Sequence, residues 1–179
     1  MLTVVIGGAR SGKSEVAEAI ASRLATPVTY LAAGGIWDDP GAEETAAQHW
    51  QNKIDRHRQR RPRDWQTVEI RPGEPLAGIV AKTRGGILID SIGPWMAGCN
   101  PFDSMSVDLL GALGEREGWS VVVTDEVGLG VHPPTAAGIE FRDAMGEMNR
   151  SLAAMASCCY FVVAGRALSL DQAAFEVPR

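Results

Sequence analysis

Residues 1–24, MLTVVIGGARSGKSEVAEAIASRL, decide the fold because they combine three signals in a fixed order. A short β-branched apolar run at residues 2–6 is typical of a strand that is buried on both faces. Gly7 and Gly8 end that run, and residues 14–24 then place apolar side chains at helical spacing. The stretch therefore predicts a strand, a glycine-rich turn and a helix.

The turn has the spacing G-x-x-x-x-G-K-S of a phosphate-binding loop, in the strand-to-helix context that this pattern requires. Glycines allow successive backbone N–H groups to converge on phosphate oxygens. The lysine can neutralise charge on the β- and γ-phosphates, the last serine can bind Mg²⁺, and the helix N-terminus adds a partial positive charge. We predict a nucleoside triphosphate site formed by Gly7, Gly8, Ala9, Arg10, Ser11, Gly12, Lys13 and Ser14.

Strand and helix patterns alternate along the rest of the chain. Strand patterns cover residues 27–33, 65–70, 87–90, 120–125 and 159–164, and one more short element is expected after Arg166. Helical patterns cover residues 43–58, 76–83, 106–117 and 140–157, with a loop at 34–41. This alternation predicts an α/β fold with a mostly parallel sheet flanked by helices, in a single domain of residues 1–179.

The last of these helices carries an apolar stripe, which we assign to the core rather than to a ligand surface. Its members are Phe141, Met145, Met148, Leu152 and Met155. In a parallel sheet the ligands bind beyond the carboxyl ends of the strands. The site is therefore expected at the strand ends.

Two strand ends carry a carboxylate that could assist the phosphate loop. Asp90 ends the strand at 87–90, and Asp125, followed by Glu126, ends the strand at 120–125. Either carboxylate could hold Mg²⁺ directly or through water, or could simply cap an acidic strand end. We assign Asp90, together with Ser14, to the metal.

Composition and charge exclude several classes of protein. Hydrophobic residues make up 45% and charged residues 22%, and the formal net charge is -5, which argues against a general polyanion binder. No apolar run approaches the roughly 20 residues that span a bilayer, and we see no signal peptide, so a cytoplasmic location is expected. Cys99, Cys158 and Cys159 form no C-x-x-C pair and are assigned as reduced packing residues.

A basic segment stands out in this acidic chain. Residues 53–65, KIDRHRQRRPRDW, contain six of the 17 basic residues and a single histidine, His57. The segment could be a nucleic-acid arm, a solvated helix face, or a histidine among cations that hold phosphate. Only Trp50 and Trp65 flank it, whereas single-strand binders usually interleave stacking aromatics.

Several segments, in order, resemble the bifunctional adenosylcobinamide kinase / adenosylcobinamide-phosphate guanylyltransferase family of cobalamin biosynthesis. They are GGARSGKS at 7–14, YLAAGG at 30–35, RHRQRRPRDWQTVE at 56–69, ILIDSIGPW at 87–95, DEVGLGVHP at 125–133 and EFRDAMGEMNRSLAAMA at 140–156. The combination of H-R-x-x-R-P-x-x-W-x-T-V-E with E-V-G-x-G-V-x-P is the most specific part. The resemblance implies a recombinase-like P-loop NTPase architecture and a homo-oligomer, with a trimer suspected.

The resemblance also implies two reactions. ATP or GTP phosphorylates adenosylcobinamide, and a histidine then takes GMP from GTP and passes it to the new phosphate, giving adenosylcobinamide-GDP. By position that histidine is His57, and a covalent step of this kind splits one difficult displacement into two. The nucleotide contacts implied outside the phosphate loop are Ala32, Ala33, Gly34, Arg58, Gln59, Arg60, Arg61, Glu69 and Asp90, and the substrates are small molecules rather than nucleic acid.

The sequence departs from the family pattern at several places. Ala33 and Gly34 replace Thr and Ser, Asp125 replaces Asn, Pro94 interrupts a hydroxyl-rich stretch, and about nine extra residues precede His57. These departures leave two alternatives: a P-loop kinase without guanylyltransferase activity, and an ATP-dependent nucleic-acid-binding module. The other two histidines, His49 and His132, are assigned structural or solvated roles.

Overall fold

The computed structural model describes residues 1–24, 27–33 and 62–170. The predicted loop at 34–41 and the predicted helix at 43–58 lie outside these residues. The strands are β1 (Leu2–Gly7), β2 (Val28–Ala32), β3 (Gln66–Glu69), β4 (Gly86–Asp90), β5 (Ser120–Asp125), β6 (Cys158–Val163) and β7 (Arg166–Ser169). The helices are α1 (Lys13–Ala21), α3 (Leu76–Lys82), α4 (Ile92–Ala97), α5 (Ser106–Glu115) and α6 (Ala136–Met155).

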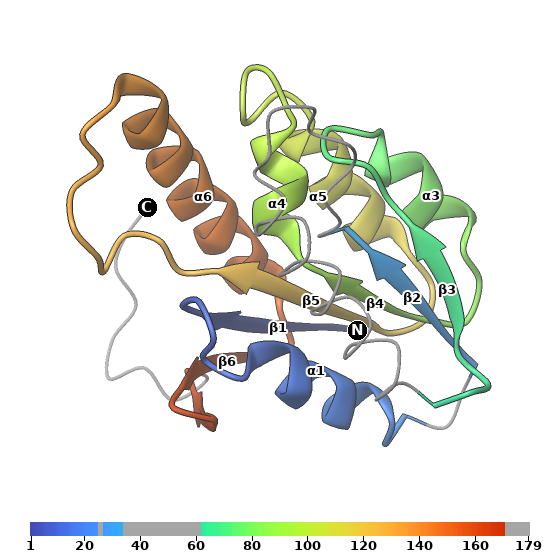
Figure 1. Ribbon diagram of the computed structural model, residues 1–179. Coiled ribbons are helices and arrows are strands. Elements are labelled where there is room, and N and C mark those ends of the chain that lie inside the picture. The colour runs from blue at the N-terminus through green and yellow to red at the C-terminus, as the bar shows by residue number, and fades with distance from the viewer. Residues whose placement is uncertain (25–26, 34–61, 171–179) are drawn as a thin grey trace, which may run out of the picture.

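The strands form one seven-stranded sheet in the order β3-β2-β4-β5-β1-β6-β7 (Figure 1). Every neighbouring pair is parallel except β6 and β7, which are antiparallel. The predicted α/β fold with a mostly parallel sheet is therefore confirmed. The short element expected after Arg166 is β7, an edge strand whose residues are all exposed.

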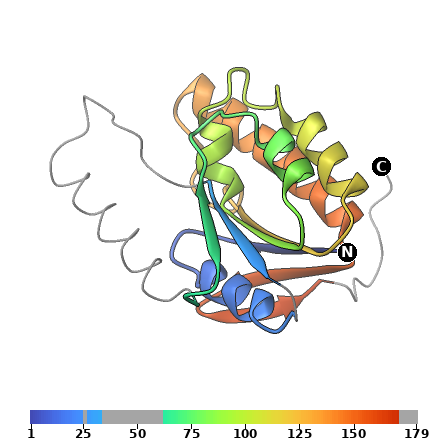
Figure 2. The ribbon, with the colours of Figure 1, turned by 90° about the vertical axis from the view of Figure 1, so that its right-hand side faces the viewer.

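Helices cover both faces of the sheet, with α1 on one side and α3, α4, α5 and α6 on the other (Figure 2). Successive residues of a strand point to opposite faces. In β1, Val4 packs in the cluster on the four-helix side and Val5 in the cluster around α1, and both are fully buried. Burial of both faces explains why central strands such as β1 and β2 are largely apolar, whereas the edge strands β3 and β7 are exposed and more polar.

The predicted stripe of the last helix is mostly core. Met145, Met148 and Leu152 are buried, Phe141 packs against the same cluster, and Met155 is 39% exposed at the helix end. The helix begins four residues before the predicted start at residue 140. Thr135 explains this start, because its hydroxyl accepts a hydrogen bond from the N–H of Gly138 at 3.1 Å and caps the first turn.

Helix α4 was not predicted. Its sequence, IGPWMA, contains a glycine and a proline, which weaken any helical pattern. Pro94 is the third residue of the helix, where a backbone N–H would have no partner within the helix, so the proline costs little there. The helix positions Trp95, which is fully buried and donates from its indole N–H to the carbonyl oxygen of Glu74 at 2.7 Å.

None of the three cysteines forms a disulfide, in line with the predicted reduced state. Cys99 and Cys159 are buried and Cys158 is half-buried. Burial raises the pKa of the Cys99 thiol, which disfavours the reactive thiolate. These residues therefore pack in the fold and need no chemical role.

Candidate active site

The phosphate loop lies between β1 and α1, and the turn between β6 and β7 supports it. Gly12 has a φ of 94°, which favours glycine, and a Cβ there would lie 3.2 Å from the Cα of Gly165. Gly165 belongs to the β6–β7 turn and donates its N–H to the carbonyl oxygen of Ser11 at 2.8 Å. The turn between β6 and β7 therefore supports the phosphate loop from outside the β1–α1 unit.

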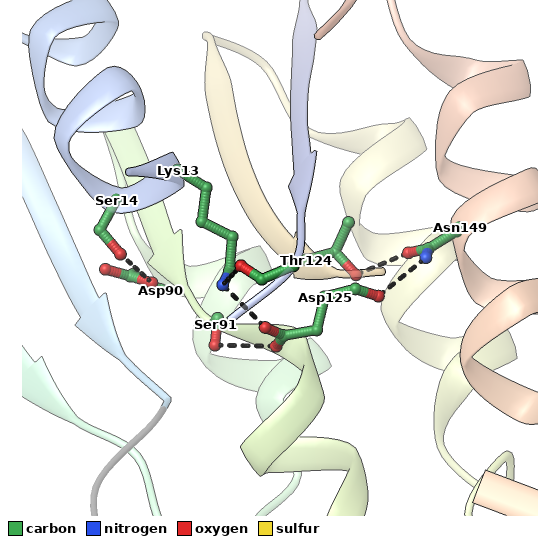
Figure 3. A network of polar contacts seen from close by, with 8 residues as sticks. Lys13, Ser14, Asp90, Ser91, Thr124, Asp125 and Asn149 are labelled. Carbon is green, nitrogen blue, oxygen red and sulfur yellow. Dashed lines mark hydrogen bonds and ion pairs between the residues drawn. The ribbon is translucent and has the colours of Figure 1, made fainter. Parts of the chain in front are cut away.

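Asp90 at the end of β4 meets the phosphate loop through Ser14. The hydroxyl of Ser14 donates to Oδ1 of Asp90 at 3.2 Å (Figure 3). The hydroxyl of Tyr30 donates to Oδ2 of the same carboxylate at 2.6 Å. Tyr30 comes from β2 and is only 1% exposed. Two neutral donors thus orient the carboxylate so that one oxygen faces the first turn of α1.

Asp125 at the end of β5 meets the loop through Lys13. The ammonium of Lys13 lies 2.9 Å from Oδ1 of Asp125 and also donates to the carbonyl oxygen of Gly8 at 3.1 Å. Oδ2 of the same carboxylate accepts from the hydroxyl of Ser91 at 3.4 Å. Gly93 in α4 lies close to it, because a Cβ at that position would come 2.2 Å from Oδ2.

The main chain at the end of β5 is fixed from two sides. The N–H of Glu126 donates to the carbonyl oxygen of Gly7 at 3.1 Å. On the other side, the amide of Asn149 in α6 donates to the carbonyl oxygen of Asp125 at 3.0 Å and accepts from the hydroxyl of Thr124 at 2.6 Å. Sequence reasoning missed Asn149, although a polar residue inside the apolar stripe of α6 was a signal that could have found it.

Glu126, the neighbour of Asp125, has a different task. Its Oε1 accepts hydrogen bonds from the N–H groups of Gly128 at 2.6 Å and Leu129 at 3.2 Å. These bonds hold the turn that follows β5. The carboxylate at this strand end that contacts the phosphate loop is therefore that of Asp125.

The sites predicted on β2 and β3 lie farther along the same edge of the sheet. In the strand register Ala32 pairs with both Asp90 and Glu69, and Ala33 donates its N–H to the carbonyl oxygen of Asp90 at 3.0 Å. Neighbouring strands lie about 4.8 Å apart and β3 is two strands from β4, so Glu69 is roughly 10 Å from Asp90, which itself contacts Ser14. The predicted residues on β2 and β3 therefore continue the strand-end edge outward from Asp90.

The remaining predicted site residues lie outside the described residues: Gly34, His57, Arg58, Gln59, Arg60 and Arg61. His49 lies there too. His132 is described and exposed, and its Nδ1 is 2.8 Å from Nη1 of Arg142. This surface contact agrees with the structural or solvated role predicted for His132.

The donor set suits a magnesium ion that is shared with a nucleotide. Among the described residues, no group of three or more His, Cys, Asp or Glu could hold a metal ion by itself. The Ser14 hydroxyl and the Asp90 carboxylate, 3.2 Å apart, are the hard oxygen donors that Mg²⁺ takes together with phosphates and waters. Within the same part of the chain, no helix is long and apolar enough to cross a membrane.

A glycine-rich loop between a buried parallel strand and a helix, with carboxylates ending two nearby strands, defines a P-loop nucleotide-binding α/β protein. An ATPase of the type III secretion system of pathogenic bacteria shares the fold, with a TM-score of 0.56 and 11% identity over 94% of this chain and 56% of that one. The family model for cobinamide kinase / cobinamide phosphate guanyltransferase matches residues 3–170. The chain belongs to this family.

Two relatives show the same relationship over almost their whole length. One is the bifunctional adenosylcobalamin biosynthesis protein CobU of Escherichia coli (strain K12), 34% identical over 92% of this chain and 97% of that protein. The other is the corresponding protein CobP of Pseudomonas aeruginosa, 31% identical over 95% and 97%. The predicted resemblance, and with it the enzyme class of a cobinamide kinase and guanylyltransferase of cobalamin biosynthesis, is confirmed.

Proposed function

We propose that the described site carries the kinase step. Lys13 and the loop N–H groups bind the triphosphate, and Ser14 with Asp90 holds Mg²⁺, which neutralises charge on the β- and γ-phosphates when it is bound. The observation that carries this assignment is the hydrogen bond between Ser14 and Asp90 beside the Lys13–Asp125 ion pair. Both lie where ligands of parallel sheets bind.

In this step the acceptor is the aminopropanol hydroxyl of adenosylcobinamide. Its oxygen forms a bond to the γ-phosphorus of ATP or GTP, the bond from that phosphorus to the bridging oxygen breaks, and a nucleoside diphosphate leaves. The hydroxyl proton is released to solvent or to a nearby base. Positioning and charge neutralisation by the phosphate loop supply most of the catalysis in reactions of this kind.

We propose that His57 carries GMP in the second step. Its Nδ1 or Nε2 forms a bond to the α-phosphorus of GTP, pyrophosphate leaves, and the GMP then passes to the phosphate of adenosylcobinamide phosphate. The sequence pattern around His57 and the family match support this role. Arg58, Gln59, Arg60 and Arg61 follow it in the chain, and Ala32, Ala33, Gly34 and Glu69 are proposed as the remaining contacts with nucleotide.

Labelled nucleotides test the two steps separately. With γ-labelled ATP or GTP, Mg²⁺ and adenosylcobinamide, the label is expected on the corrinoid, and Lys13→Ala should remove the transfer. With α-labelled GTP, an acid-labile and base-stable adduct of the protein is expected, and His57→Ala should abolish it. His132→Ala, which removes an exposed histidine, is the matched control and should keep the adduct.

The outcomes also separate the alternatives. Label transfer to the corrinoid without any adduct would support the kinase-only alternative, whereas salt-sensitive binding of single-stranded oligonucleotides without label transfer would support the nucleic-acid module. The family match favours the bifunctional enzyme. The cytoplasmic location, the single domain and the homo-oligomer, with a suspected trimer, stay predictions.

A further inference from the structure

Asn149 is a polar residue on the core-facing side of α6. It is 8% exposed, and its neighbours on that side, Met145, Met148 and Leu152, are buried apolar residues. A polar side chain in such a position costs stability unless its hydrogen bonds are made. Asn149 makes them, and both go to the end of β5 (Figure 3).

The two bonds fix the orientation of the amide. Nδ2 donates to the carbonyl oxygen of Asp125 at 3.0 Å, and a carbonyl oxygen can only accept. Oδ1 therefore faces the hydroxyl of Thr124, which donates to it at 2.6 Å and is fully buried. The side chain thus ties α6 to two successive residues of β5.

The residue that Asn149 holds is the one whose carboxylate meets the phosphate loop. Oδ1 of Asp125 lies 2.9 Å from Nζ of Lys13. The N–H of the same peptide group, which belongs to Glu126, points to the opposite side and donates to the carbonyl oxygen of Gly7 at 3.1 Å. Because aspartate has a short side chain, the position of its main chain largely decides where its carboxylate lies.

We propose that Asn149 is a positioning residue for phosphoryl transfer, which acts by holding the Asp125 carbonyl so that the Asp125 carboxylate stays against Lys13. This role rests on the proposed kinase function of the site. It requires a donor at Nδ2, which neither leucine nor an ionised aspartate supplies. The acceptor at Oδ1 serves mainly to hold Thr124.

Three variants test the proposal through kcat and KM for γ-phosphate transfer. Asn149→Leu and Asn149→Asp should both lower kcat on the order of tenfold, while KM for the triphosphate changes by less than about threefold. Asn149→Asp keeps an acceptor for Thr124, so an equal fall in kcat assigns the effect to the lost donor. Thr124→Val removes only the bond to Oδ1 and should change kcat by less than about threefold.

Two controls separate positioning from stability. Leu152→Ala empties a fully buried position one turn further along α6 and should lower Tm with kcat unchanged. In an Asp125→Ala background, Asn149→Leu should cause no further fall in kcat, because its target is gone. The proposal would be overturned if the double variant lost kcat by the product of the two single losses. It would also be overturned if Leu152→Ala lost as much kcat as Asn149→Leu.

Hydrogen exchange gives a readout that needs no turnover. In the nucleotide-free chain, Asn149→Leu should speed deuterium uptake more at the phosphate loop, residues 7–14, than in the strands of the sheet. Leu152→Ala should instead raise uptake, if at all, evenly over the sheet. Uptake at residues 7–14 that matches the unaltered chain would contradict the proposal. If the unaltered chain transfers no phosphate to adenosylcobinamide, the proposed function fails, and this exchange measurement still decides the role of Asn149.

Discussion

Asp90 and Asp125 end two neighbouring strands of one sheet, and the contacts that join them to the phosphate loop differ in kind. Ser14 and Tyr30 donate neutral hydroxyl hydrogen bonds to Asp90, at 3.2 and 2.6 Å. Asp125 instead takes a charge-assisted contact from Lys13 at 2.9 Å. A hydroxyl orients a carboxylate and leaves its negative charge in place, whereas an ammonium largely cancels that charge.

This difference divides the work of the two carboxylates. The negative charge of Asp90 beside the Ser14 hydroxyl suits a metal ion, because Mg²⁺ prefers carboxylate and hydroxyl oxygens. The charge of Asp125 is matched to Lys13 at 2.9 Å, and under the proposed kinase function its task is to orient this cation toward the phosphates. Side chains on other elements support each residue: Tyr30 of β2 for Asp90, and Asn149 of α6 for Asp125.

The largest expected effect comes from removing the charge of Asp90. Asp90→Asn keeps the shape of the side chain, but metal ions contribute several kcal/mol to reactions of this kind, and each 1.4 kcal/mol is about tenfold in rate. We expect kcat for γ-phosphate transfer to fall on the order of a thousandfold and the Mg²⁺ concentration for half-maximal rate to rise. Asp108→Asn, which removes an exposed charge from α5, should change neither value. If Asp90→Asn left the Mg²⁺ concentration for half-maximal rate unchanged, Asp90 would not be a ligand of the metal.

A smaller effect is expected from displacing Asp125 without changing its charge. In Gly93→Ala the new Cβ would lie 2.2 Å from Oδ2 and 3.0 Å from Cγ of Asp125, so the carboxylate must move away from Lys13 and Ser91. We expect kcat to fall by tens of fold, since a misplacement of about 1 Å can cost a hundredfold. The free energy of unfolding should change little. Alanine is about 1 kcal/mol better than glycine within a helix, and this gain offsets the cost of displacing the carboxylate.

A second glycine provides the control for this variant. Gly111 lies in α5, and a Cβ there would meet nothing within 4 Å. Gly111→Ala should therefore raise Tm by the same gain in helix propensity and leave kcat unchanged. If Gly93→Ala were as active as Gly111→Ala, the position of the Asp125 carboxylate would not matter for transfer.

The sequence predicted the parts of this site that depend on local order. The phosphate loop follows from a strand, glycines and a helix within residues 1–24, and Asp90 and Asp125 follow from the rule that sites lie at strand ends. Both strand ends indeed reach the loop, at Ser14 and Lys13. What the spacing alone could not decide is which carboxylate faces the hydroxyl and which faces the ammonium.

The supporting residues escaped sequence reasoning because their bonds cross long stretches of chain. Tyr30 and Asp90 are 60 residues apart, and Asn149 and Thr124 are 25 apart. Tyr30 has the pattern of any core residue of β2, and only the pairing of β2 with β4 brings it to Asp90. Helix α4, which positions Gly93, was missed because Gly93 and Pro94 hide its helical pattern.

The smallest expected effect comes from loosening Asp90 while keeping its charge. Tyr30→Phe removes only the hydroxyl that donates to Oδ2 and leaves the buried ring, which packs against Trp65 at 6.5 Å between centroids. We expect the Mg²⁺ concentration for half-maximal transfer to rise about tenfold, the lower end for a lost hydrogen bond behind a metal ligand, while metal-free nucleotide binding is unchanged. Binding of Mn²⁺ with nucleotide, followed by electron paramagnetic resonance, should weaken by the same factor without any turnover. Equal weakening of metal-free nucleotide binding would show that the Tyr30 hydroxyl supports the whole edge of the sheet rather than the metal site. The contrast drawn between Asp90 and Asp125 would then be wrong.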